Sequence, residues 1–188
     1  KDSDLLLDSV LEDSVEEVVV LDETQDEALG EEEITEEEAE EPVLLLESRT
    51  TSFPTTQDAH LQSGKGYNQS IVRLEEGNRT SYLMFDLSPI GDIKASITEV
   101  ELQFTIVSDK GNGVVNVFKG QSNDWSESSL TKDSSPTTGI LLGSVTKEYE
   151  IGATESIPLN EENFDEAMKT LILSHENGDD LSFASKEH

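Results

Sequence analysis

The chain lacks cysteine, has a single tryptophan and carries few basic residues, and each shortage excludes a class of protein. Without cysteine there is no disulfide framework and no thiolate metal site. Twelve Lys and Arg stand against 42 Asp and Glu, so the formal net charge is −30. Nucleic acids and anionic membrane surfaces would repel such a chain, and we expect neither as a partner. No apolar run approaches the ~20 residues that a membrane-spanning helix needs.

The negative charge is concentrated at the start of the chain. Residues 1–47 contain 20 Asp/Glu and one Lys, a net charge of −19, and residues 48–188 contain 22 Asp/Glu and 11 Lys/Arg, a net charge of −11. Because like charges at this density oppose compaction, we expect residues 1–47 to be an acidic linker, largely disordered or marginally structured. Residues 48–188 are long enough for one domain with a sizeable core.

Two alternatives stay open within the acidic part. Leu7, Leu11 and Val18 fall loosely on one helical face, which allows a marginal amphipathic helix. Residues 43–46 allow a first strand of the domain or a last strand of a preceding one. The chain begins with Lys and not Met, so we expect a monomeric module cut from a longer protein.

From residue 48 onward the pattern is typical of β structure. Val100, Leu102, Phe104 and Ile106 alternate with polar residues, as in an antiparallel strand with one face in a core. Strands are predicted at 59–62, 71–75, 81–87, 97–107, 114–119, 140–146, 156–158, 169–175 and 181–184, separated by Gly, Asn, Asp, Ser and Pro. Residues 160–168 are the one helical candidate, with Asn160 as its cap and Phe164 and Met168 facing the sheets. The pattern predicts an all-β antiparallel sandwich or barrel with one short helix.

Catalytic patterns are scarce. The three histidines, His60, His175 and His188, occur in no metal-binding or nucleophile-activating spacing. Asp86 is the one carboxylate in an apolar segment, and we expect it to cap a turn with Ser88. We therefore predict that the chain is not an enzyme.

Five short motifs, in order, resemble the DNRLRE-type domain. They are Asp58-Ala-His-Leu61 with Gly66-Tyr-Asn68, Arg79-Thr-Ser-Tyr-Leu-Met-Phe-Asp-Leu87, Ile97-Thr-Glu-Val-Glu-Leu102, Trp125-x-Glu127-x-x-Leu130-Thr131, and the closing Asn177-Gly-Asp-Asp-Leu-Ser-Phe-Ala-Ser-Lys-Glu187. The resemblance covers about residues 55–187. It implies a β-sandwich of jelly-roll type, found as an appended module in large secreted bacterial proteins.

One branch of that family is carbohydrate-binding module family 96, which includes modules that bind alginate, an acidic polysaccharide. The resemblance implies that Lys65, Tyr67, Arg73 and Arg79 bind the carbohydrate. Guanidinium groups suit sugar carboxylates or sulfates, and an aromatic ring packs on a pyranose face. Surface ion pairing of the two arginines with nearby acids is an equally good interpretation. Trp125 is expected to be a packed structural residue.

A structural Ca²⁺ is a further expectation, because jelly-roll modules often hold one with Asp, Asn and backbone oxygens. Asp58 and Asp179 are the candidate ligands. The alternative, favoured by the Asn-Gly-Asp sequence at 177–179, is a plain hairpin turn.

The sequence therefore favours a secreted, non-catalytic module that binds an acidic, algal-type polysaccharide. A structural or adhesive spacer of a cell-surface protein, without a glycan ligand, is the rival hypothesis. A catalytic β-sandwich lyase is a third, which would need Tyr, His and Arg gathered in one groove.

Overall fold

The structure is a computed structural model that describes residues 3–11, 47–91, 97–164 and 166–188. These residues form eleven strands, a 3₁₀ helix and a further 3₁₀ turn at 88–91. The strands are β1 (Asp4–Leu11), β2 (Glu47–Gln62), β3 (Lys65–Tyr67), β4 (Ile71–Leu74), β5 (Arg79–Asp86), β6 (Ile97–Thr105), β7 (Asn112–Gly120), β8 (Thr138–Glu148), β9 (Thr154–Leu159), β10 (Met168–Glu176) and β11 (Leu181–Ala184), and the helix is η2 (Glu161–Asn163). Each predicted strand overlaps one of them.

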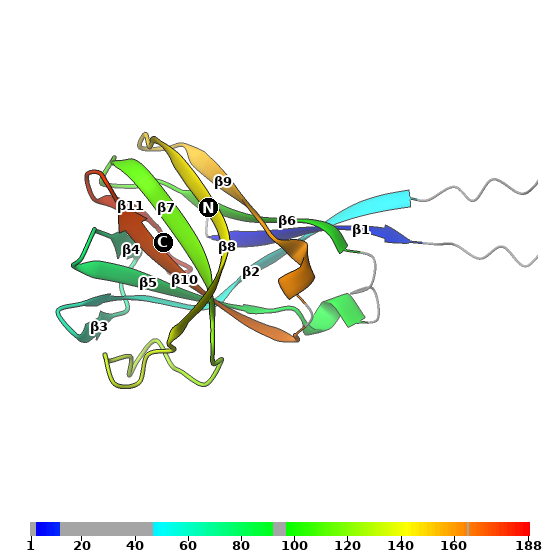
Figure 1. Cartoon of the computed structure of the whole chain (residues 1–188), viewed down its shortest axis with the longest axis horizontal. Helices are drawn as coiled ribbons and strands as arrows, with labels where there is room; N and C mark the ends of the chain where they lie inside the picture. The colour runs from blue at the N-terminus through cyan, green and yellow to red at the C-terminus, as the bar shows by residue number, and fades with distance from the viewer. Residues whose placement is uncertain (1–2, 12–46, 92–96, 165) are drawn as a thin grey trace, which may run out of the picture.

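The strands form two antiparallel layers joined by the long strand β2 (Figure 1). The first half of β2 pairs with β1, the second half pairs with β5, and the register shifts between Thr55 and Gln57. One layer runs β9-β6-β1-β2 and the other β2-β5-β10-β7-β8. The backbone N–H of Asn160 donates to the carbonyl of Leu142 (2.9 Å), which brings β8 beside the end of β9. The predicted antiparallel β-sandwich is confirmed.

The main core lies between the layers, where alternate residues point inward. Val100, Leu102, Phe104 and Ile106 are buried as predicted. They pack with inward-facing residues of the other strands, among them Leu83, Phe85, Leu171 and Leu173. Strands β4 and β11 form a two-stranded sheet at one end of the sandwich and add Leu74 and Phe183 to the core.

A second apolar cluster covers the outer face of β5 and β10. Tyr82, Met84 and Ile172 point away from the main core and pack against Trp125 and Leu130. The Trp125 indole N–H donates to Thr170 Oγ1 at 3.0 Å, inside the protein. The segment between β7 and β8 therefore closes the outer face of this layer, and the structural role expected for Trp125 is confirmed.

Strand β1 corrects the expectation that all of residues 1–47 form a linker. Residues 4–11 lie between β2 and β6 and pair with both. Leu5 and Leu7 point into the core and are buried. In a sheet these alternate leucines are buried, whereas in a solvated helix they would stay exposed. The free energy of their burial outweighs the repulsion between the neighbouring acids. Residues 12–46, with Val18 and 43–46, lie outside the described residues.

The predicted helix is shorter than expected. Asn160 caps it as predicted, because its side-chain oxygen accepts from the backbone N–H of Glu162 (3.0 Å). Only residues 161–163 are helical, and Phe164 follows with its ring buried. Met168 is already the first residue of β10, where it pairs with Asp86, so sheet pairing ends the helical turn early. Asp86 accepts from the backbone N–H of Ser88 (2.9 Å), as the sequence predicted.

Candidate functional site

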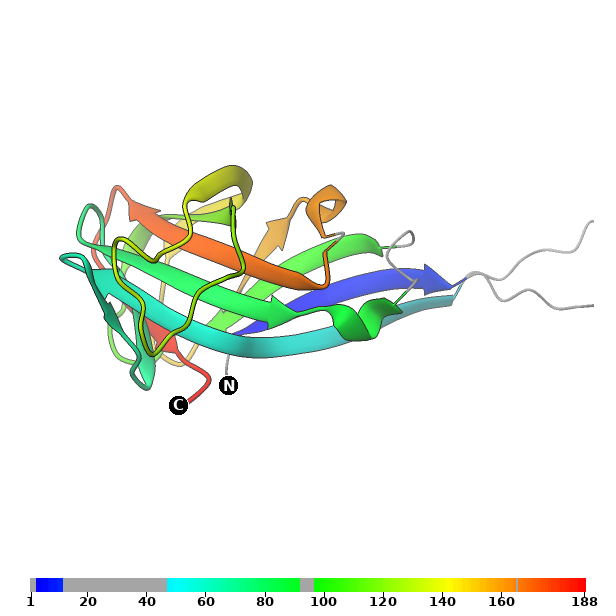
Figure 2. The same cartoon turned by 90° about the horizontal axis from the view of Figure 1, so that it is seen from below.

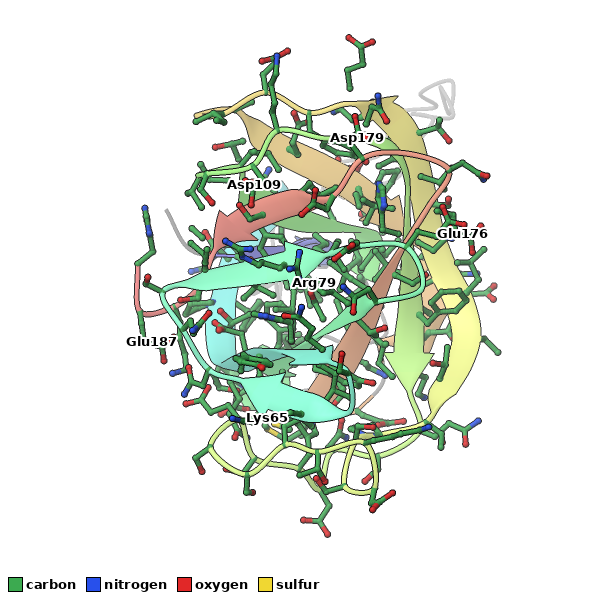
Figure 3. The ribbon with its side chains drawn as sticks, turned by 90° about the vertical axis from the view of Figure 1, so that its left-hand side faces the viewer. Lys65, Arg79, Asp109, Glu176, Asp179 and Glu187 are labelled. Carbon is green, nitrogen blue, oxygen red and sulfur yellow. The ribbon has the colours of Figure 1, made fainter. Side chains whose placement is uncertain are left out.

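The four residues predicted to bind carbohydrate lie at one end of the sandwich, on β3, β4 and the start of β5. Figure 3 looks onto this end, with Lys65 and Arg79 labelled. His60 on β2 lies among them, since it pairs with Tyr67 on one side and with Ser81 on the other. We call His60, Lys65, Tyr67, Arg73 and Arg79 the basic end.

Tyr67 is held between two neighbours. Its ring stacks on the imidazole of His60, with centroids 5.3 Å apart and planes inclined by 12°. The Lys65 ammonium lies over the Tyr67 ring, 5.5 Å from its centroid. His60 is buried, Tyr67 is half-buried and Lys65 is exposed. The three side chains therefore run from the interior to the surface, and the aromatic ring carries a cation at its outer end.

His60 is a neutral support for this ring. Burial lowers the pKa of His60 to about 4, and the positive charges of Arg79 and Arg73 add to this effect. An imidazole with this pKa is uncharged at neutral pH. Positive charge at the basic end therefore comes from Lys65 and the two arginines alone.

Arg79 is committed to ion pairs within the protein. Its Nη1 lies 3.0 Å from Glu75 Oε2 and 3.0 Å from Asp180 Oδ2, and its side chain is 14% exposed. It joins the turn after β4 to the turn before β11. Because the side chain is largely buried and two carboxylates lie beside it, this guanidinium offers little accessible surface to a sugar carboxylate.

Arg73 is paired more loosely. Its Nη2 lies 3.7 Å from Asp109 Oδ2, with 33% of the side chain exposed. A pair of this length at the surface contributes little to stability and exchanges readily for another partner. The structure thus supports the ion-pair interpretation fully for Arg79 and only partly for Arg73.

Asp58, one of the two candidate calcium ligands, is buried on β2 and forms a charged cluster with Glu127, Lys186 and Glu187. Its Oδ2 accepts from the backbone N–H of Lys186 (2.7 Å), and its own N–H donates to Glu127 Oε2 (3.0 Å). The Lys186 ammonium pairs with Glu127 at 2.9 Å and also with Glu187. Burial raises the pKa of Asp58 to about 6, and Glu187 and Glu127 contribute to the rise. A lysine ammonium therefore supplies the cation beside these carboxylates.

Asp179, the other candidate, has different neighbours. It lies exposed in the turn between β10 and β11, and its backbone N–H donates to Asn112 Oδ1 (3.0 Å). Within the part of the chain that the structure describes, no three His, Asp or Glu side chains gather as a metal site requires. The described geometry does not fit the calcium expectation, which stays a prediction.

A scan against protein-family models matches residues 47–188 to carbohydrate-binding module family 96. The chain belongs to this family. The match takes in both layers of the sandwich, the basic end and the Asp58 cluster, and it begins after β1. A search of curated proteins finds no match.

The family assigns a role in binding carbohydrate, without catalysis, and confirms the recognition made from the five sequence motifs. The described part of the module contains no helix long and apolar enough to cross a membrane.

Lys132 is a cation of the module that the sequence analysis missed. Its backbone N–H donates to the carbonyl of Gly64, and the N–H of Gly66 donates to the carbonyl of Leu130, both at 3.0 Å. A Cβ at Gly66 would lie 2.3 Å from that Leu130 oxygen, so this close pairing requires glycine. Lys132 is exposed beside the β2–β3 turn. No local motif places it there, because the two hydrogen bonds join residues 68 and 64 positions apart in the sequence.

Lys65 and Lys132 form no ion pair with another described residue. Among the described residues, three Lys or Arg side chains form no ion pair with another described residue, namely Arg49, Lys65 and Lys132. Two of these three lie at the tip of the module formed by β3 and the 130–132 segment. Two lysines without an ion pair thus lie at this tip, and one of them, Lys65, lies over Tyr67.

Proposed function

We propose that this module binds an acidic polysaccharide of algal type at the basic end, as part of a secreted bacterial protein. The observation that carries the proposal is the pair of exposed lysines at the β2–β3 hairpin: Lys65 lies over the Tyr67 ring, and Lys132 adjoins Gly64 in the turn. Each ammonium donates to a sugar carboxylate or sulfate, and the Tyr67 ring offers an apolar edge to a pyranose.

The two arginines have different parts in this proposal. Arg79 holds the turns in place through Glu75 and Asp180 and acts as a positioning residue. Arg73 can exchange its long contact with Asp109 for a sugar carboxylate. The binding surface is then smaller than the four residues predicted from the sequence, and weak affinity gains from avidity with other modules.

The strong negative charge of the chain does not prevent this binding. Strand β2 begins at Glu47, where it pairs with Leu11 at the end of β1, and the β3 hairpin lies at the opposite end of β2 (Figure 1). The sixteen residues of β2 span roughly 50 Å. At physiological salt the Debye length is ≈ 8 Å, so charges at one end of β2 are screened from a polyanion at the other.

Affinity electrophoresis of the whole chain in gels containing alginate, carrageenan, agar or neutral glycans tests the proposal. We expect retardation by the acidic glycans, and less retardation for Lys65→Gln and Lys132→Gln. Lys110→Gln is the matched control, because it removes the same charge from an exposed lysine that pairs only with Glu150 across 3.9 Å. Absence of retardation in every gel would instead support the spacer hypothesis, which the internal pairing of Arg79 favours. Equal effects of all three variants would indicate non-specific charge attraction.

A further inference from the structure

A pocket of about 240 Å³ lies at the opposite end of the sandwich from the basic end. Strand β5 ends at Asp86, and its pairing with β2 reaches back only to Thr55. The earlier part of β2 continues beyond β5, with β1 and β6 beside it. Figure 2 shows β1 and β2 extending past the other layer. Among the described residues, the 3₁₀ turn at 88–91 lies against the inner face of this extension, where Pro89 and Ile90 line the pocket.

The described residues that line the pocket are mostly apolar and include one cation. They are Leu7, Phe53, Pro89, Ile90 and Ile97, together with Thr51 and Arg49. An engineered apolar cavity of about 150 Å³ holds benzene. A pocket of 240 Å³ therefore has room for a hydrocarbon group of roughly eight carbons.

Arg49 gives the pocket its chemical preference. Its side chain is exposed and forms no ion pair with any described residue, although acids outnumber bases in this chain by 42 to 12. Leu7 on β1 pairs with Thr51 on β2, two residues from Arg49. The apolar side chain of Leu7 and the cation of Arg49 are therefore close in the sheet. A guanidinium beside an apolar pocket suits a ligand that combines a hydrocarbon chain with a carboxylate.

We propose that this pocket binds a small amphipathic carboxylate, with its hydrocarbon chain against Phe53 and Ile90 and its carboxylate on Arg49. The site is separate from the basic end and from carbohydrate binding. It depends on Leu7 of β1, a strand that lies outside the family match over residues 47–188. It is thus a property of this chain beyond the matched family region.

Charge alone would not provide the affinity. The net charge of −30 repels an anion at long range, so burial of the hydrocarbon chain must contribute most of the binding. Affinity should therefore depend steeply on chain length. Removing two methylene groups should weaken binding about fifteenfold.

The test is a titration of the whole chain with octanoate, followed by amide chemical shifts in ¹H–¹⁵N NMR spectra. We expect shifts at Leu7, Phe53, Ile90 and Ile97, and binding of hexanoate about fifteenfold weaker. Arg49→Gln should weaken octanoate binding about threefold and leave binding of the uncharged octanol unchanged. Lys65→Gln, at the other end of the molecule, should leave octanoate binding intact.

Three outcomes would overturn the proposal: no shifts at saturating octanoate, shifts confined to other surfaces, or an equal loss of octanol binding in Arg49→Gln. The spectrum of Arg49→Gln without ligand shows whether the variant is folded. Failure of polysaccharide binding would leave this result untouched, because no residue is shared by the two sites.

Discussion

The imidazole of His60 and the ring of Tyr67 stack 5.3 Å apart, with their planes inclined by only 12°. The two residues are direct cross-strand partners on β2 and β3. Because β3 contains only three residues, this contact fixes much of its position. Tyr67 owes its orientation at the surface to a neighbour whose own side chain is buried.

Replacing His60 should therefore change carbohydrate binding indirectly. We expect His60→Ala to weaken binding to the glycan that retards the wild type, about threefold or more, since aromatic pairs contribute ≈ 0.5–1.5 kcal/mol. His60→Phe keeps a ring beneath Tyr67 and should retain the affinity. Affinity electrophoresis measures both, and equal losses in the two variants would show that stacking is not the cause.

Replacing Arg79 should destabilise the domain more than replacing Arg73. Arg79→Ala leaves Glu75 and Asp180 without their shared cation, and we expect a loss of about 1–2 kcal/mol, reduced by the partial exposure of both acids. Arg73→Ala breaks only a long surface contact and should cost less than about 0.5 kcal/mol. Urea unfolding followed by the fluorescence of Trp125 measures the difference. Equal losses would contradict the distinct roles assigned here.

The buried hydrogen bond between Trp125 and Thr170 in the outer apolar cluster should contribute to stability. Thr170→Val removes the acceptor of the Trp125 indole N–H while nearly keeping the side-chain shape. The donor is then buried without a partner, which should cost about 1–3 kcal/mol. Urea unfolding again measures this, with Thr138→Val, at an exposed position of β8, as control. A loss no larger than that of the control would mean that water reaches the indole.

Strand β1 is tested by truncating a core leucine. Leu5 is fully buried between β2 and β6, so Leu5→Ala should destabilise the domain by about 2–5 kcal/mol, like Leu102→Ala on β6. Thermal and urea unfolding of both variants provide the measurement. If Leu5→Ala unfolds like the wild type while Leu102→Ala does not, β1 contributes nothing to the domain.

Alternation predicted the strands well where one face is apolar throughout. Val100 to Ile106 is such a segment, and the structure buries every second residue of it. β2 was recognised only over 59–62, because its earlier part alternates polar Ser and Thr with few apolar residues. Its pairing with β1 extends it to sixteen residues. That pairing depends on a strand 36 residues earlier across an acidic segment, which local pattern cannot detect.

The sequence pointed to four candidate binding residues, whose role stays a prediction, but it did not show which of them form ion pairs. Motif resemblance located Lys65, Tyr67, Arg73 and Arg79, and the fold gathers them at one end. The ion pair of Arg79 with Asp180 spans 101 positions in the sequence, and the contact of Lys132 with Gly64 spans 68. Such contacts arise from chain topology, so the sequence alone could not separate the paired arginine from the free lysine.

His60 and Asp58, both buried on β2, should change the stability of the domain in opposite directions as the pH falls. Protonation of His60 is resisted in the folded state, where its pKa is about 4 against an ordinary 6.5. The unfolded chain then binds the proton first, so this group lowers stability as the pH falls from about 6.5 to 4. Asp58 behaves oppositely, because its folded pKa of about 6 exceeds the ordinary 3.8. The folded state binds that proton first, and stability rises as the pH falls through 6 toward 4.

Over this pH range each group changes the free energy of unfolding by about 3 kcal/mol. The two changes have opposite sign, so in the wild type they nearly cancel. On going from pH 7 to pH 4, the free energy of unfolding of His60→Phe should rise by about 3 kcal/mol relative to the wild type. That of Asp58→Asn should fall by about the same amount. The double variant should follow the wild type. Urea unfolding at the two pH values measures all four proteins. Changes of the same sign in both single variants would contradict the assignment, since the exposed carboxylates common to all four proteins cancel in the comparison.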